Sequence, residues 1–212
     1  MEKENETDYI PTKSFKPSGI SSCRRALYYQ LTGVMPDTAA PDTNLVGICE
    51  SGTHRHDDIQ SYVCAMSEHG IDCEWLDVGD YIIQNNIPDL DIIGQRGHET
   101  KLYSTKYNMR FMCDGLIRYK GELYILEIKT ESSRKYGSHS EPHADHKLQA
   151  ACYSMTLQVP KVIFIYENRD VCSKKGFLFE VPNTMVEYVE DIINSVNKAV
   201  VDNVIPCKES DK

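Results

Sequence analysis

Residues 108–130 read NMRFMCDGLIRYKGELYILEIKT and carry the clearest strand pattern in the chain. Apolar and polar residues alternate on both sides of the pair Lys120 and Gly121, which predicts two strands joined by a two-residue turn. Counting residues back from this turn along both strands sets Asp114 directly opposite Glu127. The sequence therefore predicts a β-hairpin in which two carboxylates face each other.

Two facing carboxylates require a positive group nearby. Directly opposed residues have Cβ atoms about 5 Å apart, and like charges at that separation are destabilising. Lys129 follows Glu127 by two residues and so projects from the same face of the strand, whereas Ile128 points into the core. We therefore expect a positive charge between the two acids, with Lys129 beside Glu127.

This arrangement resembles a known catalytic motif. An acid on one strand, followed on the next by an acid two residues before a lysine, is similar to the PD-(D/E)-x-K nuclease motif, here Asp114, Glu127 and Lys129. A solvated hairpin face with a Glu–Lys ion pair would use the same residues. A short motif alone does not separate the two interpretations.

A histidine in a predicted helix strengthens the resemblance. His56 shares an apolar stripe with Ile59 in the helix expected over residues 50–69, while His54 lies off that stripe. An inward histidine is more often a core residue than a ligand. However, GTHRHDDIQ at residues 52–60 resembles the RecB-like pattern in which a metal-binding histidine follows a glycine by four residues.

Two further segments resemble RecB-like nucleases, a group that includes CRISPR-associated exonucleases. SSCRRALYYQLTG at residues 21–33 is similar to their first helix, and Gln149 with Tyr153 is similar to their QxxxY motif. The motifs occur in the order and spacing of the family over about residues 18–155.

The resemblance implies an α/β fold with a restriction-endonuclease-like core, in which helices flank a central mixed β-sheet. It implies a single nuclease domain over residues 18–205, between a flexible lead-in at 1–17 and a polar tail at 206–212. The implied chemistry is phosphodiester hydrolysis assisted by Mg²⁺ or Mn²⁺. The metal ligands would be His56, Asp114, Glu127 and the carbonyl of Ile128; Lys129 would orient or deprotonate the attacking water, and Gln149 and Tyr153 would complete the catalytic set.

Basic residues outside the motifs are candidates for contact with DNA phosphates. These are Arg24 and Arg25 in the first helix, and Arg134 and Lys135 in the polar segment after the hairpin. The first pair would equally suit the solvated side of an amphipathic helix. Candidates for stacking on bases are Tyr28, Tyr136 and Tyr153.

The overall charge bears on the type of nuclease. A net charge of −9 opposes diffuse binding of internal duplex, because nonspecific affinity comes mainly from lysine and arginine at phosphates. We therefore expect an exonuclease that acts on linear DNA from its ends. The alternatives are a structure-specific or nicking endonuclease of the same superfamily and a catalytically silent DNA-end-binding protein. The sequence leaves open strand polarity, a homo-oligomer and a recombination partner protein, and whether the setting is phage DNA processing, repair or a CRISPR-type module.

Composition indicates an ordinary globular protein, with 41% hydrophobic and 26% charged residues. No apolar run approaches 18 residues and the first residues lack a signal-peptide pattern, so we expect a cytoplasmic protein without membrane contact. The eight cysteines form no CxxC pair, which fits a reducing compartment.

The cysteines and histidines also bear on other metals. Iron–sulfur relatives use one early cysteine, matched by Cys23, and three clustered late ones, but the only late cysteines here are Cys172 and Cys207, so no cluster is expected. Three histidines at 139, 143 and 146 raise the question of zinc, which the lack of nearby cysteines disfavours.

The remaining segments are expected to support the core. We expect loops at 34–46 and 131–141, a strand within 73–83, a helix over 142–158, strands at 161–168 and 176–182, and a final helix from residue 184. Residues 84–100 are expected to be a connection, with Glu99 as a solvated glutamate.

Overall fold

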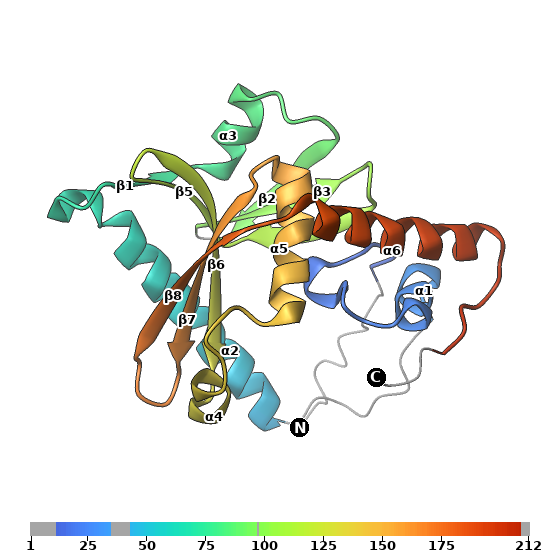
Figure 1. Ribbon diagram of the computed structural model, residues 1–212, viewed down its shortest axis with the longest axis horizontal. Helices are drawn as coiled ribbons and strands as arrows, with labels where there is room; N and C mark the ends of the chain where they lie inside the picture. The colour runs from blue at the N-terminus through green and yellow to red at the C-terminus, as the bar shows by residue number, and fades with distance from the viewer. Residues whose placement is uncertain (1–11, 35–42, 97, 209–212) are drawn as a thin grey trace, which may run out of the picture.

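A computed structural model describes residues 12–34, 43–96 and 98–208. Its centre is a five-stranded sheet in the order β1-β5-β6-β7-β8 (Figure 1). The β6–β7 pair is parallel and the other pairs are antiparallel, which confirms the predicted mixed sheet. The strands span Cys73–Leu76, Gly115–Tyr119, Glu122–Glu131, Lys161–Asn168 and Lys174–Glu180.

The predicted hairpin is formed by β5 and β6. Tyr119 pairs with Glu122, which leaves Lys120 and Gly121 as a two-residue turn. Their φ angles are 51° and 78°, and positive φ at both positions suits the twist of the flanking strands. The hairpin prediction is confirmed, including the register that sets the acids opposite each other.

A second sheet of three strands was not predicted. It consists of β2 (Leu90–Arg96), β3 (Glu99–Ser104) and β4 (Met109–Cys113). The sequence prediction of a connection over residues 84–100 is therefore wrong. The run before the turn, expected to be one strand, divides at Asp114 between β4 and β5, so the chain passes from one sheet to the other at this acid.

The junction between β4 and β5 requires a glycine because the backbone at Gly115 passes close to the ring of Trp75. Gly115 follows Asp114, and a Cβ atom added at Gly115 would lie 2.8 Å from Cζ3 of the Trp75 ring in β1. Any side chain at this position would clash with the indole, so the glycine allows the chain to turn from β4 into β5 against the neighbouring strand.

Helices cover both faces of the main sheet. On one face α2 (Thr43–Cys64) packs through Ile59 and Val63 onto Leu126 and Ile128 of β6. On the other face lie α1 (Arg24–Thr32), α5 (Ala144–Leu157) and α6 (Asn183–Val201), with α5 in front of the sheet in Figure 1. The shorter helices are η1 (Pro17–Gly19), η2 (Ser67–His69), α3 (Val78–Gln84) and α4 (Ser133–Gly137).

Three segments differ from the sequence expectation. Helix α2 begins at Thr43, inside the predicted loop 34–46, and α4 lies inside the predicted loop 131–141. Phe15, in the expected flexible lead-in, is fully buried and forms a bridge with Met109 of β4, so this part of the lead-in is packed. Among the described residues, no helix combines the length and apolar content needed to cross a membrane.

Candidate active site

Asp114 and Glu127 are held in place by the main sheet. Asp114 lies just before the β5–β6 pairing of Gly115 with Leu126, which sets it opposite Glu127. Its Oδ2 accepts a hydrogen bond of 2.8 Å from the backbone N–H of Ile128, and its backbone oxygen accepts one of 2.6 Å from Gln60. The two acids are only 8% and 1% exposed, so the carboxylates are both fixed and largely shielded from water.

Lys129 supplies the positive charge that the facing acids require. Its Nζ lies 2.6 Å from Oε1 of Glu127 and donates a hydrogen bond of 2.9 Å to Oε1 of Gln149 on α5. The amide nitrogen of Gln149 donates in turn to the hydroxyl of Tyr153, at 2.6 Å. Gln149 and Tyr153 therefore orient Lys129, and Glu127, Lys129, Gln149 and Tyr153 form one connected chain of contacts.

His56 approaches the acids from α2. Its Nδ1 lies 3.7 Å from Oδ2 of Asp114 and 3.9 Å from Oε1 of Glu99, whereas His54 is exposed. The predicted solvated state of Glu99 is wrong, since this residue is only 4% exposed. Glu99 begins β3, so the strand that the sequence pattern did not reveal carries its carboxylate into the site.

The donor set suits a hard divalent cation. One ligand atom each from His56, Glu99 and Asp114 lie within 4.8 Å of one another. Within the described part of the chain, Oε2 of Glu127 is buried without a hydrogen-bond partner. Carboxylate oxygens with a single imidazole match the preferences of Mg²⁺ and Mn²⁺, so the residues present fit the metal implied by the sequence.

Burial and neighbouring charges shift the pKa values of the site. Burial raises the pKa of Glu127 to about 7, with Asp114 adding to the rise and Lys129 opposing it. For His56, burial alone would lower the pKa, but the contact with Asp114 and the charges of Asp114 and Glu127 outweigh it and raise the pKa. Protons therefore compete with a metal ion at this site near neutral pH.

A cavity of about 620 Å³ contains the site, lined by His56, Glu99, Asp114, Glu127, Lys129, Gln149 and Tyr153. Three exposed basic residues, Lys16, Lys101 and Arg110, also line it. The sequence alone did not identify them: Lys16 directly precedes the short helix η1, and Lys101 and Arg110 belong to the second sheet, which was not predicted. The signal that could have found Lys101 and Arg110 is alternation along β3 and β4, which places polar residues on one face.

None of the four basic residues predicted to contact DNA is among the described residues that line this cavity. Arg24 pairs with Asp191 of α6 at 2.9 Å, and Arg25 donates to the backbone oxygen of Pro206. Arg134 and Lys135 lie exposed on α4, beyond the end of β6.

Two of the three tyrosines proposed to stack on bases are unsuited to that role. Tyr28 and Tyr153 are 5% and 4% exposed, so their ring faces are covered by protein. Tyr136 on α4 is half-buried.

No protein-family model and no curated protein matches the sequence. Among solved structures, the chain is similar to the alkaline exonuclease LHK-Exo from Laribacter hongkongensis, with 13% identity and a TM-score of 0.52. The complex of LHK-Exo with dAMP gives 12% identity and a TM-score of 0.54. Both matches cover 91% of this chain and 90% of the other. The chain therefore shares the fold of an alkaline exonuclease over most of its length.

Proposed function

We propose that this chain is a metal-dependent deoxyribonuclease that hydrolyses phosphodiester bonds from DNA ends. The observation that carries the proposal is the contact of Lys129 with Glu127 opposite Asp114, inside a cavity that also holds His56 and Glu99. The fold shared with an alkaline exonuclease, one structure of which contains a deoxynucleotide, supports the same reaction class.

The metal ligands of this proposal are His56, Asp114, Glu127 and the backbone carbonyl of Ile128, and the structure adds Glu99 to the set. A bound Mg²⁺ or Mn²⁺ would neutralise the carboxylates and stabilise negative charge on the phosphate. The side chain of Ile128 is a hydrocarbon packed in the core, so only its backbone carbonyl has a ligand atom to offer.

Lys129 acts as a hydrogen-bond donor in this mechanism. Burial alone would lower the pKa of Lys129, but in the metal-free site the charges of Glu127 and Asp114 outweigh it and raise the pKa, so the amine is protonated there. A protonated amine orients the attacking water or a phosphate oxygen and cannot remove a proton. Gln149 holds the amine in position through its side-chain oxygen.

Attack from ends follows from where the positive charge lies. The chain has a net charge of −9, yet Lys16, Lys101 and Arg110 line the catalytic cavity. A strand that enters the cavity meets these cations, whereas duplex outside it meets a surface of mainly negative charge. A free end can enter such a cavity more readily than a closed circle.

The test compares linear with covalently closed circular DNA, single- and double-stranded, in Mn²⁺, in Mg²⁺ and in EDTA. We expect metal-dependent loss of linear DNA and persistence of circles. Lys129→Ala should reduce the rate by about 10²–10³-fold, the usual effect of losing one hydrogen-bond donor to the transition state. Lys120→Ala, in the turn of the same hairpin, should retain the wild-type rate. Equal degradation of circles would favour the endonuclease, and a rate unaffected by EDTA or by Lys129→Ala would contradict the proposal.

A further inference from the structure

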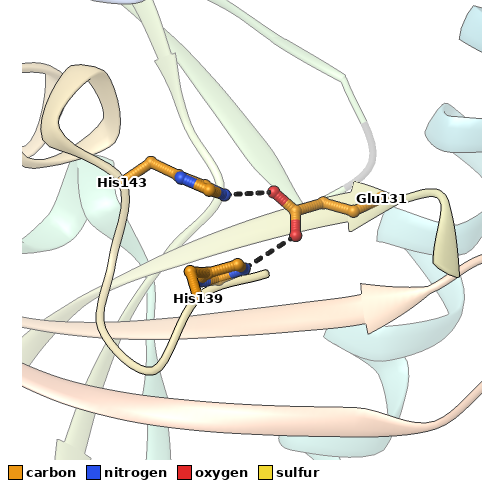
Figure 2. Close-up of side chains that lie close together, drawn as sticks. All are labelled: Glu131, His139 and His143. Carbon is orange, nitrogen blue, oxygen red and sulfur yellow. Dashed lines mark hydrogen bonds and ion pairs between the residues drawn. The ribbon is translucent and has the colours of Figure 1, made fainter. Parts of the chain in front are cut away.

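A second cluster of metal-ligating groups lies at the end of β6, two residues beyond Lys129. Glu131 is the last residue of that strand and is buried, and the connection from α4 to α5 brings His139 and His143 against its carboxylate (Figure 2). None of these three residues is among the described residues that line the cavity of the candidate active site. The cluster is therefore distinct from the proposed catalytic metal site.

The two histidines contact different oxygens of one carboxylate. His139 Nε2 lies 2.9 Å from Oε2 of Glu131, and His143 Nε2 lies 3.0 Å from Oε1, as Figure 2 shows. One ligand atom from each residue lies within 4.8 Å of the other two. The three side chains thus converge on one point from two segments of the chain.

The hydrogen-bond partners of His139 indicate a cation at this point. Its Nδ1 lies 2.7 Å from the backbone oxygen of Glu141, which can only accept, so Nδ1 carries a hydrogen. A neutral imidazole has one N–H, so Nε2 would then direct a lone pair at the carboxylate of Glu131. Either a second proton or a metal ion must lie between them, and a carbonyl that holds Nδ1–H is the usual partner of a metal-bound histidine.

His143 provides a second and independent observation. Within the described chain, its Nε2 and the facing Oε1 of Glu131 are both buried and lack hydrogen-bond partners, although they are 3.0 Å apart. The two atoms are close but not aligned as donor and acceptor. Lys135, whose side chain is 50% exposed, forms a longer ion pair with the same oxygen at 3.4 Å. A bound cation would satisfy both buried atoms.

We propose that Glu131, His139 and His143 bind Zn²⁺, with water as the fourth ligand. Two imidazoles and a carboxylate form a donor set that zinc commonly uses, whereas the candidate active site offers mainly oxygen. Zinc bonds of about 2.0–2.1 Å in a tetrahedron place ligand atoms about 3.3 Å apart. In the structure, one ligand atom from each of the three residues lies within 4.8 Å of the other two, so side-chain rotations would bring them to this spacing.

The third histidine of this segment is excluded from the site. His146 Nδ1 lies 2.8 Å from the hydroxyl of Tyr166, and His146 is not among the residues whose ligand atoms cluster with the carboxylate of Glu131. Zinc would tie the α4–α5 connection to the end of β6. Since α5 carries Gln149 and Tyr153, the ion would stabilise the position of the helix that orients Lys129.

The experiment isolates this cluster from the active site. Protein carrying His56→Gln and Asp114→Asn, freed of metal with a chelator, is titrated with Zn²⁺ and with Co²⁺. We expect one equivalent of zinc by elemental analysis, the visible absorption of tetrahedral Co²⁺ and a higher Tm in zinc. Adding His143→Gln should weaken zinc binding at least tenfold, while the matched control His54→Gln, which removes an exposed histidine of α2, should not.

In this background, His143→Gln leaves the contacts of His139 in place, so the fold should persist, and circular dichroism checks this. A variant that unfolds is replaced by Glu131→Gln, which should abolish the Co²⁺ absorption. The proposal is overturned if the background protein binds no zinc, or if the His143→Gln protein binds it as tightly. A failed nuclease assay would leave these outcomes unchanged, so the two proposals can fail separately.

Discussion

At Glu127, burial favours the protonated carboxyl group, whereas metal binding requires the ionised carboxylate. Because burial raises the pKa of this carboxyl to about 7, the metal-free group is largely protonated at pH 6 and largely ionised at pH 8. A metal ion binds the carboxylate, so binding at pH 6 must release this proton. The raised pKa of His56 acts in the same direction.

We therefore expect Mn²⁺ affinity to rise from pH 6 to pH 8; the proton of Glu127 contributes up to about tenfold per unit below pH 7, and the proton of His56 adds to the rise. Calorimetry in buffers of different ionisation enthalpy measures the released protons directly. Glu127→Gln should release fewer protons and bind more weakly. Affinity that is constant from pH 6 to pH 8 would contradict the assignment.

The same residue makes the metal-free fold sensitive to pH. Its pKa in the folded state lies above the ordinary value of 4.5, so between about pH 4.5 and 7 the folded state holds a proton that the unfolded chain releases. The contribution of this group to the free energy of unfolding therefore falls as pH rises through that window. Added Mn²⁺ should reverse the loss at pH 8, as thermal melts would show.

Tyr153 acts on Lys129 through Gln149. Tyr153→Phe removes the acceptor of the Gln149 amide, which frees the glutamine to rotate away from the lysine. We expect kcat to fall about tenfold with KM nearly unchanged, and the free energy of unfolding to fall by about 1–3 kcal/mol. Tyr81→Phe, which removes a hydroxyl bonded to Leu157, is the control for a purely structural effect, and it should leave kcat intact.

At the scale of elements, Gly115 limits how β4 can turn into β5. Gly115→Ala places a Cβ against the Trp75 ring, and we expect a loss of about 1–3 kcal/mol in the free energy of unfolding. Asp114 is adjacent, so metal affinity should fall as well. Gly137→Ala, which meets open space, is the matched control, and Trp75→Leu should partly rescue the variant. Urea unfolding measures these differences. An unchanged midpoint for Gly115→Ala would contradict the close contact between residue 115 and the Trp75 ring.

The accuracy of sequence-based prediction differs between elements. The β5–β6 hairpin was predictable because turn chemistry and alternation are local, and they fix Asp114 opposite Glu127. The strand β3 was not, because its pairing with β2 and β4 depends on contacts between segments that carry only weak local patterns. Glu99 was misjudged for that reason.

The site residues that belong to local motifs were predicted correctly as neighbours of the acids, whereas those chosen by charge were not. His56, Gln149 and Tyr153 were identified by resemblance to RecB-like motifs that each lie within a single helix, and all three line the cavity that contains the acids. Residues expected to contact DNA were chosen by charge alone. Charge does not reveal that Arg24 faces Asp191 on a helix more than 160 positions later in the chain.

For the molecule as a whole, the uneven distribution of charge predicts how DNA binding responds to salt. Lys101 and Arg110 line the cavity within a chain of net charge −9. Replacing either by Ala should reduce the slope of log K against log salt by about 1 and weaken binding regardless of sequence. Arg118→Ala, which alters charge equally but in the hairpin beside Glu74, is the control.

Fluorescence anisotropy with catalytically inactive Lys129→Ala protein and a short DNA end measures these slopes. A smaller slope for Arg24→Ala, with no effect of Lys101→Ala or Arg110→Ala, would restore the first helix as the DNA contact. An effect of Arg118→Ala as large as that of Lys101→Ala would indicate diffuse attraction.

The division of the chain at Asp114 has a mechanical consequence. Glu99 begins a strand of the small sheet, Glu127 belongs to the large one, and Asp114 joins them, so the carboxylates span the seam between two separately bonded layers. If the small layer slid or melted, these oxygens would separate while the large layer remained intact. On heating, the protein should lose its metal affinity before its global unfolding transition. A bound ion would cross-link the two sheets by binding carboxylates from both.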